Sequence, residues 1–253
     1  MGVDRKPFQG IINIIRFNWH FYLLILIICL ASIFFKNQFP LLIQKWLLIG
    51  IIIGVATTVT SLIVSFYIYD LSDLYRLKWL KPITEPGMQI LNIHAGFDET
   101  SNIIKQKFPN TIFTVCDFYN PAKHTEISIK RARRIYTLFP HTISVDTSHL
   151  PFLDNSFDIV LITLSAHEIR DINECIRFFK EIRRTLKPKG RILITEHLRD
   201  RNNFLAYTIG FTHFFSRKNW IIKFKEAHLV IVKEIKTTPF ITTFILQKDG
   251  NTF

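Results

Sequence analysis

The sequence predicts an α/β fold, in which a doubly wound and mostly parallel sheet follows two long apolar helices. From Met88 onward, short apolar segments alternate with segments of helical periodicity, which is typical of such a sheet. Ahead of Met88, residues 17–35 and 46–69 contain no charged side chain. The 253-residue chain therefore divides into an apolar N-terminal part and one α/β domain.

The clearest unit of the predicted sheet is a strand, a helix and a second strand. Residues 159–162 and 192–194 are short and apolar on both faces, as strands covered by helices on both sides must be. Between them, apolar residues recur at helical spacing: Ile172, Ile176, Phe179, Ile182 and Leu186. Asp171 and Glu174 form a predicted capping pair where this helix starts. The order predicts two parallel strands joined by a crossover helix.

The two apolar segments are each about as long as a helix that crosses a bilayer. A short loop over residues 36–45 joins them, so we expect a transmembrane hairpin over residues 17–69. A cleaved signal peptide is the alternative for the first segment, because basic residues precede it. A second apolar segment follows, however, and no clear cleavage site does.

Basic residues predict the orientation of this hairpin. Three precede it, three follow it and two lie in the loop: Arg5, Lys6 and Arg16, then Arg76, Lys78 and Lys81, against Lys36 and Lys45. The excess favours a cytoplasmic location for both ends. We therefore expect a membrane protein with a cytoplasmic segment at 1–16, a linker at 70–87 and a cytoplasmic domain at 88–253.

The net charge of +12 indicates an acidic partner. No nucleic-acid motif accompanies it, so we expect membrane lipid rather than nucleic acid. One candidate lipid-binding patch consists of Lys130, Arg131, Arg133 and Arg134. A solvated helix face is the alternative interpretation of that run.

Polar residues follow the first two predicted strands of the domain. The first strand, residues 89–93, leads into a turn that contains Gly96, and the second ends at Asp117, 21 residues further on. A carboxylate there can accept hydrogen bonds from both hydroxyls of a ribose; capping of the next loop is its alternative role. Asp98 and Glu99 in the turn would repel a pyrophosphate, which disfavours a nicotinamide dinucleotide.

The order of motifs from Ile143 to Asp200 resembles the second half of class I S-adenosylmethionine-dependent methyltransferases, in the branch with small-molecule and quinone methyltransferases. The motifs are Val145-Asp146-Thr147, Leu150 to Asp158, Ala166-His167-Glu168, Leu186-Lys187-Pro188-Lys189-Gly190 and Thr195-Glu196-His197. The resemblance implies a Rossmann-like seven-stranded methyltransferase fold that binds S-adenosylmethionine.

The same resemblance implies which residues bind the cofactor: Asn92, His94, Gly96, Asp117, Phe118, Asp146, Thr147 and Ser165. Asp146 would accept a hydrogen bond from the adenine amino group, and Phe118 would cover an adenine face. The turn departs from the family pattern, which has an acidic residue in place of Asn92 and glycines in place of His94 and Asp98. Side chains at these glycine positions would crowd a ligand.

The candidate catalytic residues follow the fourth and fifth strands: His167, Glu168, Glu196 and His197. His167 has an ordinary pKa near neutral, so it is a candidate base for a hydroxyl or phenol, with Glu168 orienting it. A helix cap with a salt bridge is the alternative role of this pair. We expect no metal site, because no histidine pair has the spacing of a zinc helix and the three cysteines are far apart.

The sequence thus predicts methyl transfer to a small apolar or membrane-partitioned molecule, such as a phenol, a quinone precursor or a lipid. An aromatic-rich segment, residues 204–215, would line an apolar acceptor pocket or enter the lipid headgroups. The alternative is a membrane-anchored scaffold of the same fold that has lost catalysis.

Overall fold

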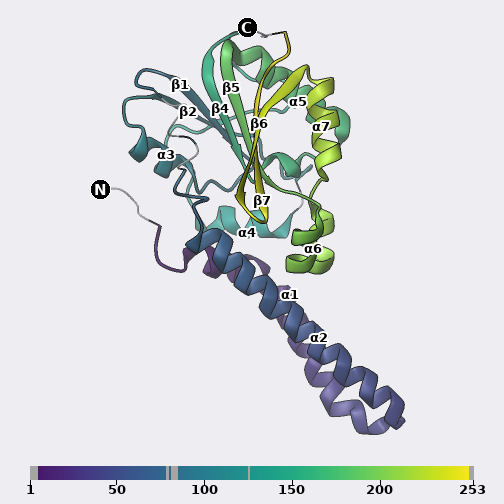
Figure 1. The fold of residues 1–253 in the computed structure, drawn as a ribbon. Helices are drawn as coiled ribbons and strands as arrows, with labels where there is room; N and C mark the ends of the chain where they lie inside the picture. Colours follow the sequence, from purple (N-terminus) through teal and green to yellow (C-terminus); the bar gives the residue numbers. More distant parts are fainter. Residues whose placement is uncertain (1–4, 78–79, 81–84, 125, 251–253) are drawn as a thin grey trace.

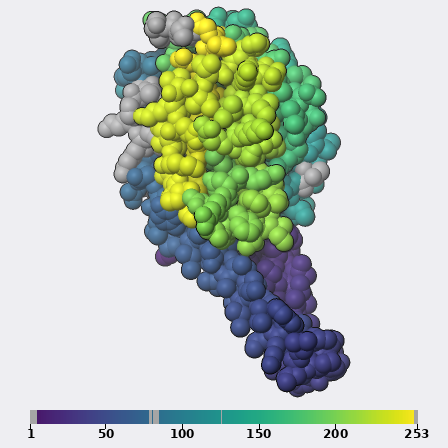
Figure 2. Space-filling view, turned by 45° about the vertical axis from the view of Figure 1, so that its right-hand side comes forward, coloured from purple at the N-terminus to yellow at the C-terminus, as the bar shows by residue number. Residues whose placement is uncertain are grey.

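The structure is a computed structural model that describes residues 5–77, 80, 85–124 and 126–250. A helical hairpin extends from an α/β domain, as Figures 1 and 2 show. The hairpin consists of α1 (Gln9–Phe35), a short 3-10 helix η1 (Lys36–Gln38) and α2 (Leu41–Phe66), which ends in a π-helical turn η2 (Tyr67–Leu71).

Seven strands form one sheet in the order β3-β2-β1-β4-β5-β7-β6. Only the pairings of β7 with β5 and with β6 are antiparallel. The strands are β1 (Gln89–His94), β2 (Ile112–Asp117), β3 (Ile143–Ser144), β4 (Phe157–Thr163), β5 (Leu186–His197), β6 (Leu229–Thr238) and β7 (Ile241–Lys248). The predicted Rossmann-like seven-stranded fold is confirmed, and the last two strands pair antiparallel at one edge of the sheet.

Helices cover both faces of this sheet (Figure 1). They are α3 (Ser101–Lys107), α4 (Ile127–Ile135), η4 (Ala166–Glu168), α5 (Ile172–Thr185), α6 (Arg201–Tyr207), η5 (Thr208–His213) and α7 (Arg217–Glu226). Helix α5 begins where predicted, because Asp171 accepts a hydrogen bond from the backbone of Glu174. Its buried face runs through Phe178 and Ile182, whereas Ile172 at its first turn is half exposed.

The predicted linker packs on the domain where the structure describes it. Leu74, Leu77 and Leu80 are buried, and the latter two belong to the apolar cluster around Ile90. Positions 78–79 and 81–84 of the predicted linker lie outside the described residues. The hairpin is therefore joined to the sheet by an apolar contact as well as by the chain.

The base of the hairpin is fixed by one carboxylate. Asp70, just beyond α2, accepts hydrogen bonds from the backbone N–H groups of Gly10 and Ile11, each at 2.8 Å. These N–H groups have no partner within α1, so Asp70 caps its start and opposes the positive end of the helix dipole. This cap explains why α1 begins at Gln9, ahead of the apolar segment that the sequence analysis places at residue 17.

The first turns of α1 pack on the domain, and the rest projects from it. Asn13 and Phe17 are buried, and the ring of Phe17 lies edge-on against that of Phe97. Asn18 has non-helical backbone angles, and its side chain donates to the carbonyl of Ile14. The kink at Asn18 thus separates a docked base from a projecting arm.

Candidate functional site

The predicted site residues gather at one edge of the sheet, because β1, β2, β4 and β5 are parallel and the residues follow their carboxyl ends. This edge is where open α/β sheets bind ligands. The hairpin base reaches the same edge. Glu99, in the turn after β1, accepts hydrogen bonds from Arg5 at 2.8 Å and from Tyr75 at 2.7 Å.

The turn after β1 places two side chains where the family pattern has glycines. His94 is buried, and its Nδ1 accepts from the N–H of Gly96 at 3.2 Å. Burial lowers the pKa of His94, although Asp98 and Asp117 oppose the shift. Asp98 accepts from the backbone of Ser101 and caps α3, so the N-terminus of this helix is already satisfied by a carboxylate.

Asp117 ends β2 as predicted, but it is not free. Arg133 of α4 donates to Asp117 Oδ2 at 2.5 Å, and its guanidinium lies 4.5 Å from the centre of the Tyr119 ring. Gly96, with φ of +85°, faces the same arginine, since a Cβ there would lie 3.0 Å from Arg133 Cδ. Arg133 thus fills the space between the predicted ribose carboxylate and the turn.

A cavity of about 430 Å³ lies beside Asp117, beyond the ends of β2 and β3. Its lining includes the predicted residues Phe118, Asp146 and Thr147, together with Tyr119 and Glu174. Phe118 is almost fully buried against Phe178, so most of its ring belongs to the core. Hydrogen bonds from Ser148 lower the pKa of Asp146, so its carboxylate is an acceptor at neutral pH.

Two further predicted cofactor residues are buried beside the turn. Asn92 donates to the hydroxyls of Thr100 and Ser101, and its Oδ1 has no hydrogen-bond partner. Ser165 donates to the backbone carbonyl of Ile93 at 3.3 Å. Both therefore support the end of β1.

His167 lies between two carboxylates. Its Nδ1 is 2.6 Å from Glu196 Oε2, and its Nε2 is 3.2 Å from Glu168 Oε1. Burial alone would lower the pKa of His167, but the charge of Glu196 and the hydrogen bonds to both carboxylates raise it to about 10. The expectation of an ordinary pKa is therefore wrong for this arrangement, because Glu196 comes from another strand and its proximity was not predicted.

His197 makes a set of contacts separate from those of His167. Its Nδ1 lies 2.9 Å from Asn203 Oδ1 and its Nε2 2.9 Å from the hydroxyl of Tyr69. The ring stacks on Phe214, with 4.6 Å between centroids. Burial lowers the pKa of His197 to about 4, so it is uncharged near neutral pH.

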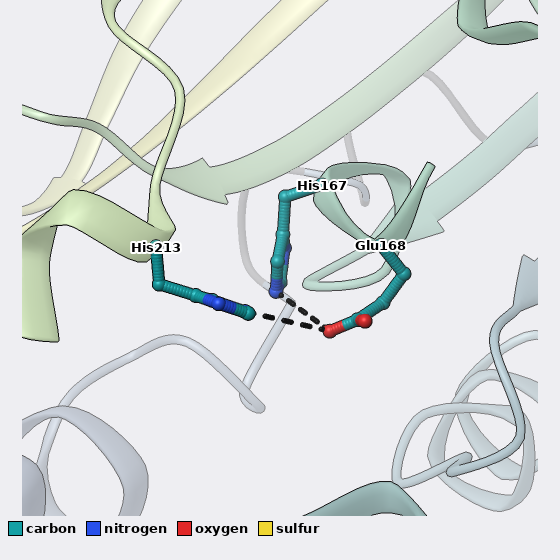
Figure 3. Close-up of side chains that lie close together, drawn as sticks. All are labelled: His167, Glu168 and His213. Atoms are coloured by element: carbon teal, nitrogen blue, oxygen red, sulfur yellow. Dashed lines mark ion pairs between the residues drawn. The ribbon is translucent and has the colours of Figure 1, made fainter. Parts of the chain in front are cut away.

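The fold also brings to this edge residues to which the sequence pattern assigns no role in the site. His213 Nε2 lies 3.6 Å from Glu168 Oε1, so His213 joins Glu168 and His167 (Figure 3). Arg133 was assigned to a surface patch, and Glu174 only to a helix cap. The aromatic and basic patterns around His213 and Arg133 gave no signal for these contacts, because each depends on how a helix or loop packs on the sheet.

The residues that line the cavity fit the adenine end of an adenosyl cofactor. The side chains around the expected ribose position must rearrange before the ribose can bind. The cavity offers Asp146 to an amino group and the ring of Tyr119 to a planar base. The buried Nε2 of His94 and Oδ1 of Asn92 have no hydrogen-bond partner and can bond a polar ligand. Arg133 must leave Asp117 before a ribose can use that carboxylate.

Comparison with known proteins agrees with the fold. Residues 95–194 match the family model described as a methyltransferase domain. A demethylmenaquinone methyltransferase of Thermotoga maritima is 30% identical over 149 residues, which are 57% of this chain and 59% of the relative. The ubiquinone/menaquinone biosynthesis C-methyltransferase UbiE of Rickettsia typhi is 34% identical over 104 residues, 38% of this chain and 39% of the relative.

The chain therefore spans less than two thirds of the length of either relative. A solved S-adenosylmethionine-dependent methyltransferase from Aquifex aeolicus has the same fold, with a TM-score of 0.50 and 15% identity over 69% of this chain and 90% of its own. Taken together, these comparisons show that residues 95–194 match a methyltransferase domain and that the domain after the hairpin has the fold of S-adenosylmethionine-dependent methyltransferases.

Proposed function

We propose that this protein is a membrane-anchored enzyme that transfers a methyl group from S-adenosylmethionine to a small apolar or membrane-partitioned acceptor. A phenol, a quinone precursor or a lipid fits this description. One observation carries the proposal: Tyr69, at the foot of the hairpin, hydrogen-bonds His197 at the end of β5. The polar residues on the acceptor side therefore lie beside the hairpin, where a molecule leaving a bilayer would arrive.

Membrane anchoring is supported by the exposure of the hairpin. Its helices contain 27 and 26 residues, about 40 Å each, enough to cross a hydrocarbon core of about 30 Å. Almost none of either apolar span is buried in the structure, whereas a core helix of a soluble protein is mostly buried. Helix α6 contacts α2 and is followed by η5; together they expose Phe204, Leu205 and Ile209, which extends the apolar surface toward the domain.

Orientation is tested with reporters fused after Phe253 and inserted between Lys36 and Lys45. We expect cytoplasmic activity at the C-terminus and extracytoplasmic activity in the loop. A C-terminal reporter active outside the cytoplasm would exclude the topology and the access to a cytoplasmic cofactor.

Residues at the carboxyl edge of the sheet would have two roles: one group would bind the cofactor and the other would position the acceptor. When bound, the cofactor supplies a methyl group on a sulfonium. A nucleophile aligned with the carbon–sulfur bond attacks this methyl group and displaces the thioether. Asp117, once released by Arg133, would accept from the ribose hydroxyls, and Asp146 from the adenine amino group. His167, Glu168, Glu196 and His197 would position the acceptor. Because its raised pKa keeps the His167 ring protonated near neutral pH, the neutral ring of His197 would take a proton where one must leave.

Cofactor binding is the decisive test, and calorimetric titration of the full-length protein in lipid nanodiscs measures it. The full chain is needed because the hairpin base contacts the turn at Glu99. We expect binding, and Asp117→Ala should weaken it by about 1 to 3 kcal/mol, the range for loss of buried hydrogen bonds. Methyl incorporation from labelled S-adenosylmethionine into phenols, quinols and lipid extracts then identifies the acceptor.

A non-catalytic scaffold is the second candidate, and the Arg133–Asp117 ion pair favours it. This pair and His94 occupy space near the turn that a cofactor would need. A folded protein that binds no S-adenosylmethionine at millimolar concentration would establish the scaffold and refute the enzyme.

A further inference from the structure

We propose that His167, Glu168 and His213 form a binding site for a divalent transition metal, with zinc as the preferred ion. One ligand atom from each residue lies within 4.8 Å of the other two. Figure 3 shows the three side chains converging from η4 and from the segment that ends at His213. Two imidazoles and one carboxylate form a ligand set that zinc uses when a fourth position stays open.

The two distances from Glu168 match those between ligands of a tetrahedral ion. Glu168 Oε1 lies 3.2 Å from His167 Nε2 and 3.6 Å from His213 Nε2. Zinc–ligand bonds of about 2.0 to 2.2 Å in a tetrahedron separate the ligand atoms by roughly 3.3 to 3.6 Å. The two histidine nitrogens lie within 4.8 Å of each other, so the three side chains can bind one ion if these nitrogens reach the same separation.

A second observation is that Glu196 holds the ring of His167 in the orientation that metal binding requires. Glu196 is fully buried, and its two carboxylate oxygens accept from the Nδ1 side of the His167 ring at 2.6 Å and from the His167 backbone N–H at 3.2 Å. When an ion displaces the proton on Nε2, the other proton stays on Nδ1 beside Glu196, and the lone pair of Nε2 is directed to the other two ligands. Carboxylate–histidine–metal relays of this kind are characteristic of zinc sites.

Arg170 competes with the ion. Its Nη2 lies 2.5 Å from Nδ1 and 2.7 Å from Nε2 of His213, and its Nη1 donates to the carbonyl of His213 at 2.6 Å. A guanidinium only donates hydrogen bonds, so its contacts with the ring nitrogens must break before Nε2 binds a cation. Removal of the Arg170 side chain should therefore tighten metal binding.

An ion at this position would have two consequences. It would tie His213, in the segment between α6 and α7, to the end of β4, and so hold that segment over the edge of the sheet. Its open position would bind the acceptor oxygen and favour transfer of the oxygen-bound proton to solvent water, a role that rests on the proposed methyl transfer. The oxygen would then attack the methyl carbon as the carbon–sulfur bond breaks, and the thioether would leave with the electron pair of that bond.

Metal titration of full-length protein tests the site. The protein is purified without a histidine tag, treated with a chelator and titrated with Zn²⁺ or, separately, with Co²⁺, whose visible absorption reports tetrahedral coordination. We expect one ion per chain. His213→Ala and His213→Gln should each weaken binding by ~100-fold or more, and Glu196→Gln by ~10- to 100-fold.

Two variants complete the design. His149→Ala is the matched control, because the His149 side chain is 76% exposed and lies outside the cluster, and it should bind metal as the unmodified protein does. Arg170→Ala should bind more tightly. Absence of tetrahedral Co²⁺ absorption, or equal binding by the His213 variants and the unmodified protein, would overturn the proposal.

The same samples are titrated with S-adenosylmethionine, with and without metal. Cofactor binding without metal binding refutes the metal site and leaves the proposed enzyme intact. Metal binding without cofactor binding supports the metal site and refutes the proposed enzyme. Because His213 lies on a half-exposed segment, its variants decide the question even where His167→Ala fails to fold.

Discussion

Arg133 Nη1 lies 2.5 Å from Asp117 Oδ2, so the carboxylate that ends β2 is paired within the chain. The same guanidinium stacks over Tyr119 and packs against Gly96, where a cofactor backbone contact is expected. About a third of the Arg133 side chain is exposed, whereas Asp117 is almost fully buried. The arginine can therefore swing toward solvent while the carboxylate stays in place.

Arg133→Ala should tighten binding of S-adenosylmethionine by about tenfold. A hydrogen bond to a charged group contributes about 1.5 to 3 kcal/mol, and the cofactor no longer has to break it. Calorimetry on the variant in nanodiscs measures the change, with Arg134→Ala, an exposed neighbour on the same helix, as the control. Weaker binding by Arg133→Ala would mean that Arg133 holds the cofactor instead of excluding it.

The same residue shows what the sequence could and could not predict. Strands β1, β2 and β4 follow from short apolar runs, and the start of α5 follows from a local capping pair, since both signals lie within a few residues. Arg133 belongs to a run of four basic side chains, and nothing in that run indicates which one faces β2. In the structure Arg133 binds Asp117, while Arg131 binds the carbonyl of Phe17 in α1.

His213 and Glu196 illustrate a second reason why the contacts within the site could not be predicted from the sequence. Each lies far along the chain from His167, and their approach depends on the crossing of the α6–α7 segment over the sheet and on the register of β4 with β5. Periodicity predicts which face of a strand is buried, but it carries no information on such distant pairs. The polar pairs were predicted at the correct edge, and their mutual contacts were not.

His167→Ala should lower methyl-transfer turnover by ~100-fold or more, with little change in cofactor affinity, because His167 lies on the acceptor side. Glu168→Gln should cause a smaller loss, since the side chain keeps its shape but not its charge. Turnover is measured with the acceptor found by the methyl-incorporation screen. Full activity of a folded His167→Ala protein would leave only structural roles for this residue.

Gly10→Ala should loosen the hairpin from the domain. A Cβ at Gly10 would lie 2.9 Å from both Asp70 Oδ2 and the backbone carbon of Tyr69, which is too close for the present contact. Overpacking of this kind costs about 1 to 3 kcal/mol. Gly50→Ala is the matched control on α2, since no atom lies within 4 Å of its added Cβ.

Thermal unfolding in nanodiscs, followed by circular dichroism, compares the two glycine variants. We expect a lower melting temperature for Gly10→Ala only. Equal melting of both variants would show that the Asp70 cap and the packing of α1 on η2 do not stabilise the domain.

His197 predicts how stability depends on pH. Its neutral ring donates from Nδ1 to Asn203 and accepts at Nε2 from the hydroxyl of Tyr69, so a second proton would break the contact with the hairpin. The other groups that act on it are the charge of His167, the carboxylate of Asp200 and the ring of Tyr207. Burial dominates and lowers the folded-state pKa to about 4, from an ordinary value of 6.5.

The unfolded chain therefore binds a proton as pH falls through 6.5, while folded His197 stays neutral until about pH 4. Protonation of His197 in the unfolded chain leaves the free energy of unfolding unchanged above pH 6.5. Below this pH it lowers the free energy of unfolding progressively, by about 2 kcal/mol at pH 5. Melting temperatures of the unmodified protein and of His197→Gln, recorded between pH 8 and pH 5, isolate the effect. The unmodified protein should lose more stability than the variant over this range, and parallel curves would mean that His197 titrates alike in both states.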